Sequence, residues 1–526
     1  MSANPESLES YLCGQWSRGR DVESELVDPT LGIVLATASA RSLDRGAALR
    51  FAREEGGSAL RALTYGERAQ LLGAVADVLA KNRGRYEAIA ISNSGNTRAD
   101  AAIDIDGGIG TLKFYARLGA QLGAARLLVD DKPVRLAKAE NFQALHILAC
   151  RRGVAVHINA FNFPSWGLWE KAAVALLAGM PVLAKPASAT AQLSHAMVRD
   201  VVAANVLPRG ALSLLCGGAG DLLDHLTGDD LVAFTGSSAT AALIRGHPNV
   251  LARGVLVNVE ADSVNAALLA PDAGPDTPAF AAFVKEVARE MTVKAGQKCT
   301  AIRRAFVPVG QATAATEALT ARLAKTVVGN PRRDDVRMGP VVTRAQQAAA
   351  LKGIAELAKQ ASVVCGGPSA PALDGIDPAK SAFVAPTLLK VDDPAAAPGV
   401  HDIEVFGPVA TLIPYKEATE AFALADRGGG SLVASVYSQD RAFLARAVAE
   451  LGATHGRVLA VDAAIADTHT GHGIVMPQCH HGGPGRAGNG EELGGLNALR
   501  LYHQRVAVQG SADLLGELQS IAAALH

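Results

Sequence analysis

Between Val154 and Glu260 the sequence alternates short apolar runs with helical stretches, and this alternation strongly limits the folds open to the chain. The apolar runs are VAVHINA, MPVLAKPA, ALSLLCGG, LVAFTGS and VLVNVE. Apolar strands separated by helices are typical of a parallel sheet that is covered on both faces. The segment therefore predicts a Rossmann-type nucleotide-binding unit, with a dinucleotide beside the loops that follow Val182, Leu215 and Phe234.

The remainder of the 526-residue chain contains three further kinds of sequence. Residues 40–125 have helical periodicity, and residues 265–476 again alternate strands and helices. Residues 133–151 and 497–510 have β character. We expect a dinucleotide-binding domain formed by residues 1–132 and 152–264, a catalytic domain at 265–476, and a small β oligomerisation element at 133–151 and 497–510. The two parts of that element pair either with each other or with a partner subunit, and we expect a homodimer.

The charge balance argues against several classes of partner. Fifty Lys and Arg residues against 51 Asp and Glu leave a net charge of −1, which offers no electrostatic reason to bind nucleic acid or an anionic membrane. The acidic N-terminus is broken by Pro5 and lacks the basic and apolar regions of a signal peptide. The apolar stretch from Ala172 to Ala184 contains Pro181 and is shorter than the roughly 18 residues of a membrane span. We expect a cytoplasmic protein.

Six cysteines are scattered without a CxxC pair, which indicates neither a disulfide framework nor a zinc ribbon. Cys299 lies in KAGQKCTAIRR, where flanking lysines and arginines favour the thiolate that a nucleophile requires. A free cysteine is also commonly a small buried hydrophobic residue. Histidines, a cysteine and an aspartate cluster again from Asp467 to His481. Their spacing fits no ordinary zinc motif and the intervening glycines indicate a loop, so we expect no metal.

Two glycine-rich segments are candidates for phosphate binding. GPGRAG, residues 483–488, matches G-x-G-x-x-G but lacks the preceding strand and following helix of a dinucleotide fingerprint. CGGAGD, residues 216–221, joins a predicted strand to a predicted helix. It is either a loop that closes against a cofactor or an ordinary tight turn, and the sequence favours neither.

Four segments together resemble the aldehyde dehydrogenase superfamily, and they occur in that family's order over nearly the whole chain. They are FNFPSWGLWEKAAVALLAGMPVLAKPA, FTGSS, GQKCT and EVFGPV. The first has an asparagine before an aromatic-proline turn and a lysine-proline pair after the next strand, and the third has the cysteine that is the family's nucleophile. The resemblance implies that family's α/β fold and the cofactor-dependent oxidation of an aldehyde to a carboxylate through a covalent thioester.

Carried over by position, the resemblance implies three catalytic residues: Cys299 as nucleophile, Asn162 in the oxyanion hole and Glu260 as general base. A side-chain amide that donates to an oxyanion typically stabilises the transition state by ~3 kcal/mol. A carboxylate at the end of the apolar strand VLVNVE is suited to take a proton from water. Apart from the resemblance, Asn162 is equally a turn residue before Phe163 and Pro164, and Glu260 a solvated acid at a strand end.

The resemblance also implies a nicotinamide dinucleotide cofactor. It assigns Lys185 to the cofactor ribose and Glu404 to the nicotinamide ribose, and further contacts are expected from Phe161, Pro186, Ser188, Gly236, Ser237 and Phe406. Many NAD-preferring members have a glutamate at the position of Ser188, and its charge repels a 2′-phosphate. A serine leaves room and a donor for that phosphate beside Lys185, so we expect NADP.

The segment CHHGGPGRAGNGEELGG is similar to one in the aldehyde dehydrogenases that oxidise CoA-linked semialdehydes from aerobic ring cleavage. We therefore expect an acyl-CoA semialdehyde as substrate. In this interpretation the glycines expose backbone N–H groups, and His481 and Arg486 lie in a substrate loop that receives the pantetheine or phosphate end of CoA. The alternative is a flexible lid that contacts no ligand.

Three other functions compete with this interpretation. The chain is a general aldehyde dehydrogenase without CoA specificity, an enzyme that passes the acyl group to free CoA, or a catalytically silent binding or structural relative. The presence of Asn162, Glu260 and Cys299 argues against the silent relative, and Glu260 favours water as the acceptor. One departure lies beside the base, because the family usually has Leu-Gly-Gly there and this chain has Ala261-Asp262-Ser263.

Overall fold

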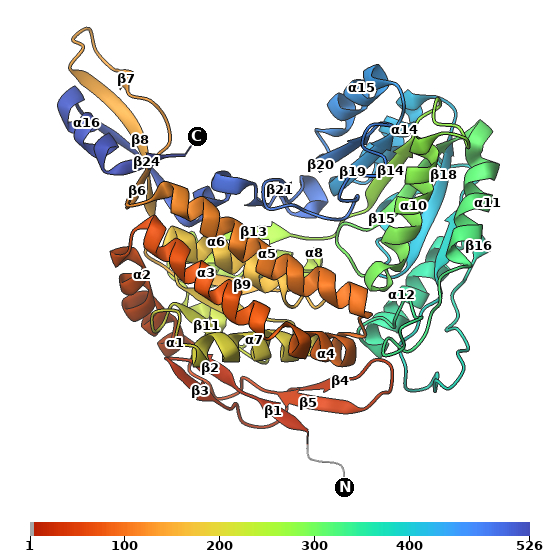
Figure 1. Cartoon of the computed structure of the whole chain (residues 1–526), viewed down its shortest axis with the longest axis horizontal. Coiled ribbons are helices and arrows are strands. Elements are labelled where there is room, and N and C mark those ends of the chain that lie inside the picture. Colours follow the sequence, from red (N-terminus) through yellow and green to blue (C-terminus); the bar gives the residue numbers. More distant parts are fainter. Residues whose placement is uncertain (1–4, 526) are drawn as a thin grey trace.

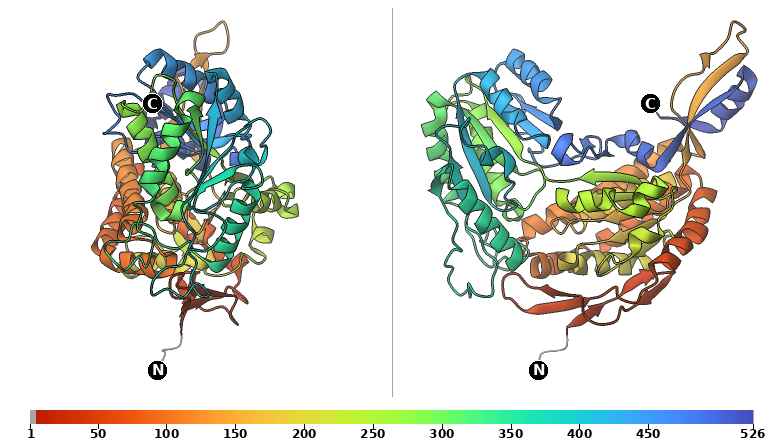
Figure 2. Two further views of the ribbon diagram at one scale, coloured as in Figure 1. Left: turned by 90° about the vertical axis from the view of Figure 1, so that its right-hand side faces the viewer. Right: turned by 180° about the vertical axis from the view of Figure 1, so that it is seen from behind.

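The computed structural model describes residues 5–525; residues 1–4, which fall in the first predicted domain range and in the N-terminal segment discussed above, lie outside the described residues, as does residue 526. Two α/β bodies lie next to each other, and an arm projects from the far end of one of them (Figures 1 and 2). This architecture confirms the predicted fold class of a Rossmann-type body, a second α/β body and a small β element. Among the described residues, no helix is long and apolar enough to cross a membrane.

The first body is built on a seven-stranded sheet with the order β13-β12-β9-β10-β11-β2-β3. Its five parallel strands are β9 (Ala155–Ile158), β10 (Val182–Lys185), β11 (Leu212–Leu214), β12 (Leu231–Thr235) and β13 (Leu256–Glu260). The antiparallel strands are β2 (Ser10–Leu12) and β3 (Gln15–Ser17). Most residues of the parallel strands are buried, and this burial explains why the sequence runs are apolar throughout rather than alternating.

The helices that connect these strands cover the sheet. They are α6 (Trp166–Ala178), α7 (Ala191–Ala203), α8 (Ser238–Arg245) and α9 (Pro248–Arg253). The segment DLLDHL, which the sequence predicts as a helix, forms only a 3-10 turn at Leu222–His225. The loop before it, residues 216–221, packs against the chain itself, since a Cβ on Gly217 would lie 2.3 Å from the Ala40 nitrogen.

The helical periodicity of residues 40–125 corresponds to a run of helices that packs against α6. They are α1 (Arg45–Phe51), α2 (Ser58–Ala62), α3 (Tyr65–Lys81), α4 (Arg83–Ser94) and α5 (Arg98–Leu122), with a π-helical turn at Ala52–Gly57. Capping boxes at Thr64 and Thr97 fix the starts of α3 and α5. Three short strands that the sequence pattern does not predict form a separate sheet: β1 (Glu6–Leu8), β4 (Ser24–Val27) and β5 (Val34–Ala38).

The second body has its own seven-stranded sheet, with the order β16-β17-β18-β15-β14-β19-β20. The strands are β14 (Asn265–Leu269), β15 (Ile302–Pro308), β16 (Ser362–Cys365), β17 (Thr387–Lys390), β18 (Val409–Tyr415), β19 (Ser431–Tyr437) and β20 (His455–Val461). Only β16, at the edge, is antiparallel to its neighbour. The helices of this body are α10 (Pro278–Thr292), α11 (Ala312–Leu323), α12 (Arg344–Leu357), α13 (Gly399–Asp402), α14 (Ala418–Asp426) and α15 (Arg441–Leu451).

The projecting arm joins the two segments with β character. β8 (Phe142–Cys150) and β23 (His503–Ser511) pair in antiparallel register along their whole length, from Phe142 opposite Ser511 to Cys150 opposite His503. Its smaller elements are β6 (Leu127–Val129), β7 (Val134–Arg135), α16 (Ala512–Ser520) and β24 (Ala522–Ala524). The strand β23 begins at His503, later than the start predicted near residue 497, because Gly495–Tyr502 form a 3-10 helix.

The site residues gather where the chain passes from one sheet to the other. β13 ends at Glu260, and β14 of the second sheet begins only five residues later, at Asn265. Cys299 lies between a 3-10 turn, Val293–Gly296, and β15. Lys294 and Ala295 in that turn have φ values of 53° and 52°, a conformation that is strained for residues other than glycine. The C-terminal segment returns across this junction through β21 (His480–His481) and β22 (Glu492–Leu493).

Candidate active site

Three separate elements bring the predicted catalytic residues to one pocket. Asn162 follows β9, Glu260 ends β13, and Cys299 lies in the loop before β15. The pocket is largely apolar, and the free space inside it is only about 50 Å³. Its other lining residues include Phe163, Trp166, Glu170, Lys171, Val475 and His481.

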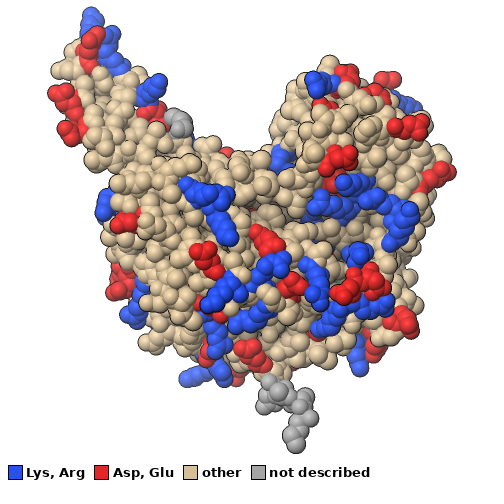
Figure 3. Space-filling view, viewed as in Figure 1, with Lys and Arg blue, Asp and Glu red and all other residues tan. Residues whose placement is uncertain are grey.

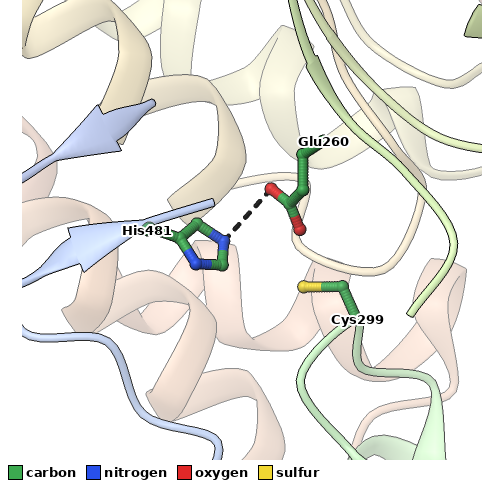
Figure 4. A group of neighbouring side chains, drawn as sticks. All are labelled: Glu260, Cys299 and His481. Carbon is green, nitrogen blue, oxygen red and sulfur yellow. Dashed lines mark ion pairs between the residues drawn. The ribbon is translucent and has the colours of Figure 1, made fainter. Parts of the chain in front are cut away.

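Glu260 is held between a histidine and the cysteine (Figure 4). The Oε2 atom of Glu260 lies 3.1 Å from Nε2 of His481, and its other carboxylate oxygen is directed toward the Cys299 sulfur. One donor atom from each of the three residues lies within 4.8 Å of the others. Glu260 and His481 are both buried, so neither charge is screened by water.

The close pairing changes the proton affinity of both partners. Burial by itself raises the pKa of Glu260, but the adjacent His481 imidazolium outweighs burial and holds that pKa well below its usual range. Burial by itself lowers the pKa of His481, and the Glu260 carboxylate reverses this and raises it. Glu260 is therefore a carboxylate and His481 an imidazolium at neutral pH.

Most of the cations that flank Cys299 in the sequence are engaged by other groups in the fold. Lys298 is paired with Glu290 at 2.7 Å, and the guanidinium groups of Arg303 and Arg304 donate to backbone carbonyls. Burial, and after it the carboxylate of Glu260, raise the pKa of the Cys299 thiol well above its usual value. Neighbours in the sequence are directed elsewhere by the fold, and the carboxylate that faces the thiol is the group placed to accept its proton.

Asn162 is fixed by its contact with the loop that carries the nucleophile. Its side-chain nitrogen donates to the Gln297 carbonyl at 3.1 Å, and the residue is nearly buried. The preceding residue, Phe161, accepts a hydrogen bond from Thr190 through its carbonyl. The amide that the sequence assigns to an oxyanion therefore lies in the same pocket as Cys299 and is held in place from both sides.

Behind Glu260 lies a group of buried charges that the sequence analysis missed. Lys171 lies 3.0 Å from Glu492 and 3.3 Å from Glu170. Burial raises the pKa of Glu170 to about 7, although Lys171 opposes that change. Carboxylate oxygens of Glu170, Glu260 and Glu492 lie within 4.8 Å of one another. A Glu-Lys pair inside the apolar run WGLWEKAAVALLAG is the sequence signal that could have revealed the group.

A second pocket lies on the other side of Cys299 and Glu260, and its free volume is about 500 Å³. It contains several residues that the sequence assigns to the cofactor: Phe161, Gly236, Ser237, Glu404 and Phe406. The start of α8 opens into it at Ser237, and a helix N-terminus is suited to a phosphate. Burial raises the pKa of Glu404 to about 7, and Arg303 opposes that change. These residues fit a nicotinamide dinucleotide.

The other three assigned cofactor residues lie at the end of β10. Lys185 is its last residue, its Nζ lies 3.4 Å from the Pro186 carbonyl, and Ser188 begins a 3-10 turn. Burial lowers the pKa of Lys185. Ser188 is half-buried and makes no side-chain hydrogen bond within the part of the chain that the structure describes. A hydroxyl donor therefore remains available at this position.

The substrate loop is divided by the fold in a way that the sequence does not indicate. His481 lines the pocket with Trp166, whereas Arg486 lines the opposite pocket with Glu404 and donates to the Asp402 carbonyl at 2.9 Å. The two residues thus line different pockets, and their assignment to substrate stays a prediction.

The glycines of that loop also differ from expectation, because close packing against the chain replaces the free backbone N–H groups. A Cβ on Gly488 would lie 2.3 Å from the Val259 carbonyl, and one on Gly483 would lie 2.4 Å from the Ser431 carbonyl. The glycines let the segment lie directly on the ends of β13 and β19.

The ligand-type residues between Asp467 and His481 are directed to different partners. The Nδ1 atom of His472 lies 2.8 Å from the Ser435 hydroxyl, and His481 pairs with Glu260.

The residues after Glu260, which depart from the usual family sequence, have a structural role. Asp262 accepts from the hydroxyl of Ser238 at 2.5 Å, and the Ser263 nitrogen donates to Glu404 at 3.1 Å. These residues connect the end of β13 to both walls of the larger pocket.

The chain belongs to the aldehyde dehydrogenase family, whose model matches residues 16–508. It is thus an oxidoreductase that acts on an aldehyde. The 3,4-dehydroadipyl-CoA semialdehyde dehydrogenase of Aromatoleum evansii is 56% identical over 478 residues, which are 91% of this chain and 93% of that protein. Aldehyde dehydrogenase family 7 member A1 of Pisum sativum is 27% identical over 82% of this chain and 81% of its own. The NAD+ complex of an aldehyde dehydrogenase from Bacillus cereus has the same fold, with a TM-score of 0.82 at 23% identity, over 96% of this chain and 97% of that one.

The ion pair predicts that His481→Gln alters the pH dependence of turnover. Without the imidazolium, burial dominates and the pKa of Glu260 rises, so the acid limb of the kcat profile moves to higher pH. We expect kcat at neutral pH to fall roughly tenfold. The control is His480→Gln, one residue away on the other face of β21. An unchanged acid limb in His481→Gln would show that the pair does not govern the base.

Proposed function

We propose that this protein oxidises an acyl-CoA-linked semialdehyde to the carboxylate with NADP as the acceptor. The observation that carries the chemistry is the placement of Cys299, Glu260 and Asn162 around one small pocket. The substrate class is supported by the 56% identity to a CoA-semialdehyde dehydrogenase over nearly the full length of both chains.

In the proposed mechanism, Glu260 accepts the thiol proton and the Cys299 sulfur attacks the aldehyde carbon. Asn162 and the backbone N–H of Cys299 donate to the oxyanion that forms. When bound, a nicotinamide would supply the acceptor for the hydride of this carbon, and loss of that hydride leaves a thioester on Cys299. Glu260 first releases the thiol proton to solvent. It then takes a proton from the water that attacks the thioester, and the carboxylate product leaves as the thiolate is restored.

Water is favoured over free CoA as the acceptor of the acyl group. The Glu260 carboxylate is ionised, is fixed by His481 and faces the sulfur on which the thioester forms. The pocket has about 50 Å³ of free space, which admits a water but not a second CoA thiol with its pantetheine arm beside the substrate.

The mechanism predicts two different failures. Cys299→Ala removes the sulfur that forms the covalent bond, so turnover falls below detection while cofactor binding is retained. Glu260→Gln removes the negative charge that helps to raise the pKa of the Cys299 thiol, so solvent can take the thiol proton and the thioester still forms. Its hydrolysis loses the general base, so we expect one burst of NADPH per site followed by a stall. Stopped-flow absorbance and cofactor titration measure both outcomes. Turnover in Cys299→Ala would refute the mechanism.

The specific substrate we propose is 3,4-dehydroadipyl-CoA semialdehyde. The test compares kcat/KM for this compound and for the corresponding semialdehyde without CoA. We expect kcat/KM to be at least about a hundredfold higher for the CoA-linked compound, because the CoA moiety contributes binding energy away from the reacting carbon. Equal values would leave a general aldehyde dehydrogenase. A requirement for added CoA with the free semialdehyde would support the acylating alternative.

The choice of NADP is proposed from Lys185 and the free hydroxyl of Ser188 at the end of β10. Ser188→Glu places a carboxylate where the 2′-phosphate binds, so kcat/KM with NADP should fall and the preference should move toward NAD by roughly a hundredfold. Ser188→Ala serves as the uncharged control, with only a small loss. A larger kcat/KM with NAD in the unmodified protein would contradict the assignment.

A homodimer is proposed from the arm. Its apolar side chains are left open to solvent: Val134, Leu136, Phe142, Val506, Leu514 and Ile521 are all more than a third exposed. β23 is also an edge strand, with unpaired backbone groups along one side. We expect light scattering at micromolar concentration to give a dimer and Val506→Lys to shift it toward the monomer, whereas Val309→Lys, far from the arm in the second body, does not. A monomeric unmodified protein would contradict the proposal.

A further inference from the structure

A cleft of about 620 Å³ lies outside both pockets of the active site. It is formed by the N-terminal end of α5, the C-terminal ends of α10 and α11, and the loop of residues 333–337. Its lining includes six cations, Arg98, Arg289, Arg322, Lys325, Arg333 and Arg337, and two acids, Asp100 and Asp334. In Figure 3 blue side chains gather on the face where α5 approaches the second body. The whole chain has a net charge of only −1, so this excess is local.

Internal pairing neutralises part of this charge. Arg98 lies 3.4 Å from Asp334, Arg333 lies 2.7 Å from Asp335, and Arg289 lies 3.5 Å from Glu286. Asp100 is buried and accepts from the Lys294 nitrogen, so it does not neutralise the surface. Arg322 and Lys325 are exposed near the end of α11, and neither has a carboxylate within 4 Å among residues 5–525. Guanidinium and ammonium groups arranged in this way bind phosphates well.

Two chain segments connect the cleft to the catalytic pocket. Arg289 in its wall lies 3.4 Å from the Thr470 carbonyl, and the same segment continues to Gly473 and Val475 in the catalytic pocket. Along α5, Asp100 lies in the cleft, and Gly107 packs against Trp166 of the catalytic pocket. Seven residues of helix span roughly 10 Å. An extended pantetheine arm is longer than this distance.

The size of the catalytic pocket requires an external site for any CoA-linked substrate. Its free space of about 50 Å³ holds an aldehyde end but excludes a nucleotide. The larger pocket on the other side of Cys299 carries the cofactor residues. We propose that the cationic cleft binds the nucleotide end of CoA, with the 3′-phosphate and diphosphate against Arg322 and Lys325. This inference rests on the proposed CoA-linked substrate.

The test uses a double charge reversal, Arg322→Glu with Lys325→Glu, in the full chain. The matched control reverses two other exposed lysines, Lys352→Glu with Lys416→Glu, for the same net change. Steady-state kinetics are measured with the CoA-linked semialdehyde, its 3′-dephospho-CoA analogue and the CoA-free semialdehyde. We expect the cleft variant alone to raise KM for the CoA-linked substrate by roughly tenfold or more at unchanged kcat, and to leave kcat/KM for the free semialdehyde unchanged.

The outcomes separate this inference from the proposed function. If the unmodified protein prefers the CoA-linked substrate and the cleft variant keeps its KM, the cleft is refuted and the proposed function stands. If the unmodified protein treats both substrates equally, the proposed function fails. Isothermal titrations with CoA and with inorganic phosphate separate the two sources of phosphate. Binding of CoA well above phosphate, and its loss in the cleft variant, supports the inference, and equal binding of both indicates a site for a free anion and overturns it.

Discussion

The buried pair of Glu260 and His481 is the interaction on which the site depends. It joins the last strand of the first sheet to a C-terminal segment more than 200 residues later in the chain. Burying either charge alone would cost several kcal/mol, and the loss is offset only when the partner is in contact. The glycines that let residues 482–490 lie on β13 and β19 make that contact possible, so backbone packing and electrostatics impose the same arrangement.

The charges behind this pair determine how protons are held near the reacting sulfur. Three carboxylates, those of Glu170, Glu260 and Glu492, share a small volume with two cations, Lys171 and His481. Full ionisation would leave one excess negative charge, and burial raises the pKa of Glu170 to about 7, which favours protonation of this carboxylate. Burial, and after it the carboxylate of Glu260, raise the pKa of the Cys299 thiol, and the same carboxylate is placed to accept the thiol proton. The site therefore combines a cysteine whose thiol has a raised pKa with a general base that is ionised and held in place by His481.

The sequence predicted those features that depend on local pattern. Buried parallel strands require continuous apolar residues, and β9, β10, β12 and β13 occur where such runs are found. The short strands before residue 39 were missed because three to five residues carry too little periodicity to identify them.

Features that depend on contacts between distant segments could not be predicted in the same way. Lys298 precedes Cys299 directly and Arg303 follows it by four residues, but they are turned toward Glu290 and the Gly407 carbonyl. His481 reaches Glu260 only because the C-terminal segment crosses back over the site. Arg486, five residues after His481 across a glycine-rich segment, lines the opposite pocket. Spacing in the sequence does not determine such directions.

Trapping the acyl-enzyme tests the central claim most directly. The Glu260→Gln variant is mixed with the CoA-linked semialdehyde and NADP, quenched in acid, digested and examined by mass spectrometry. The account predicts that the peptide containing Cys299 carries the complete acyl-CoA group as a thioester, and that the unmodified enzyme shows only a trace of it. An unmodified Cys299 peptide in the stalled variant, or an adduct on another cysteine, would contradict the account.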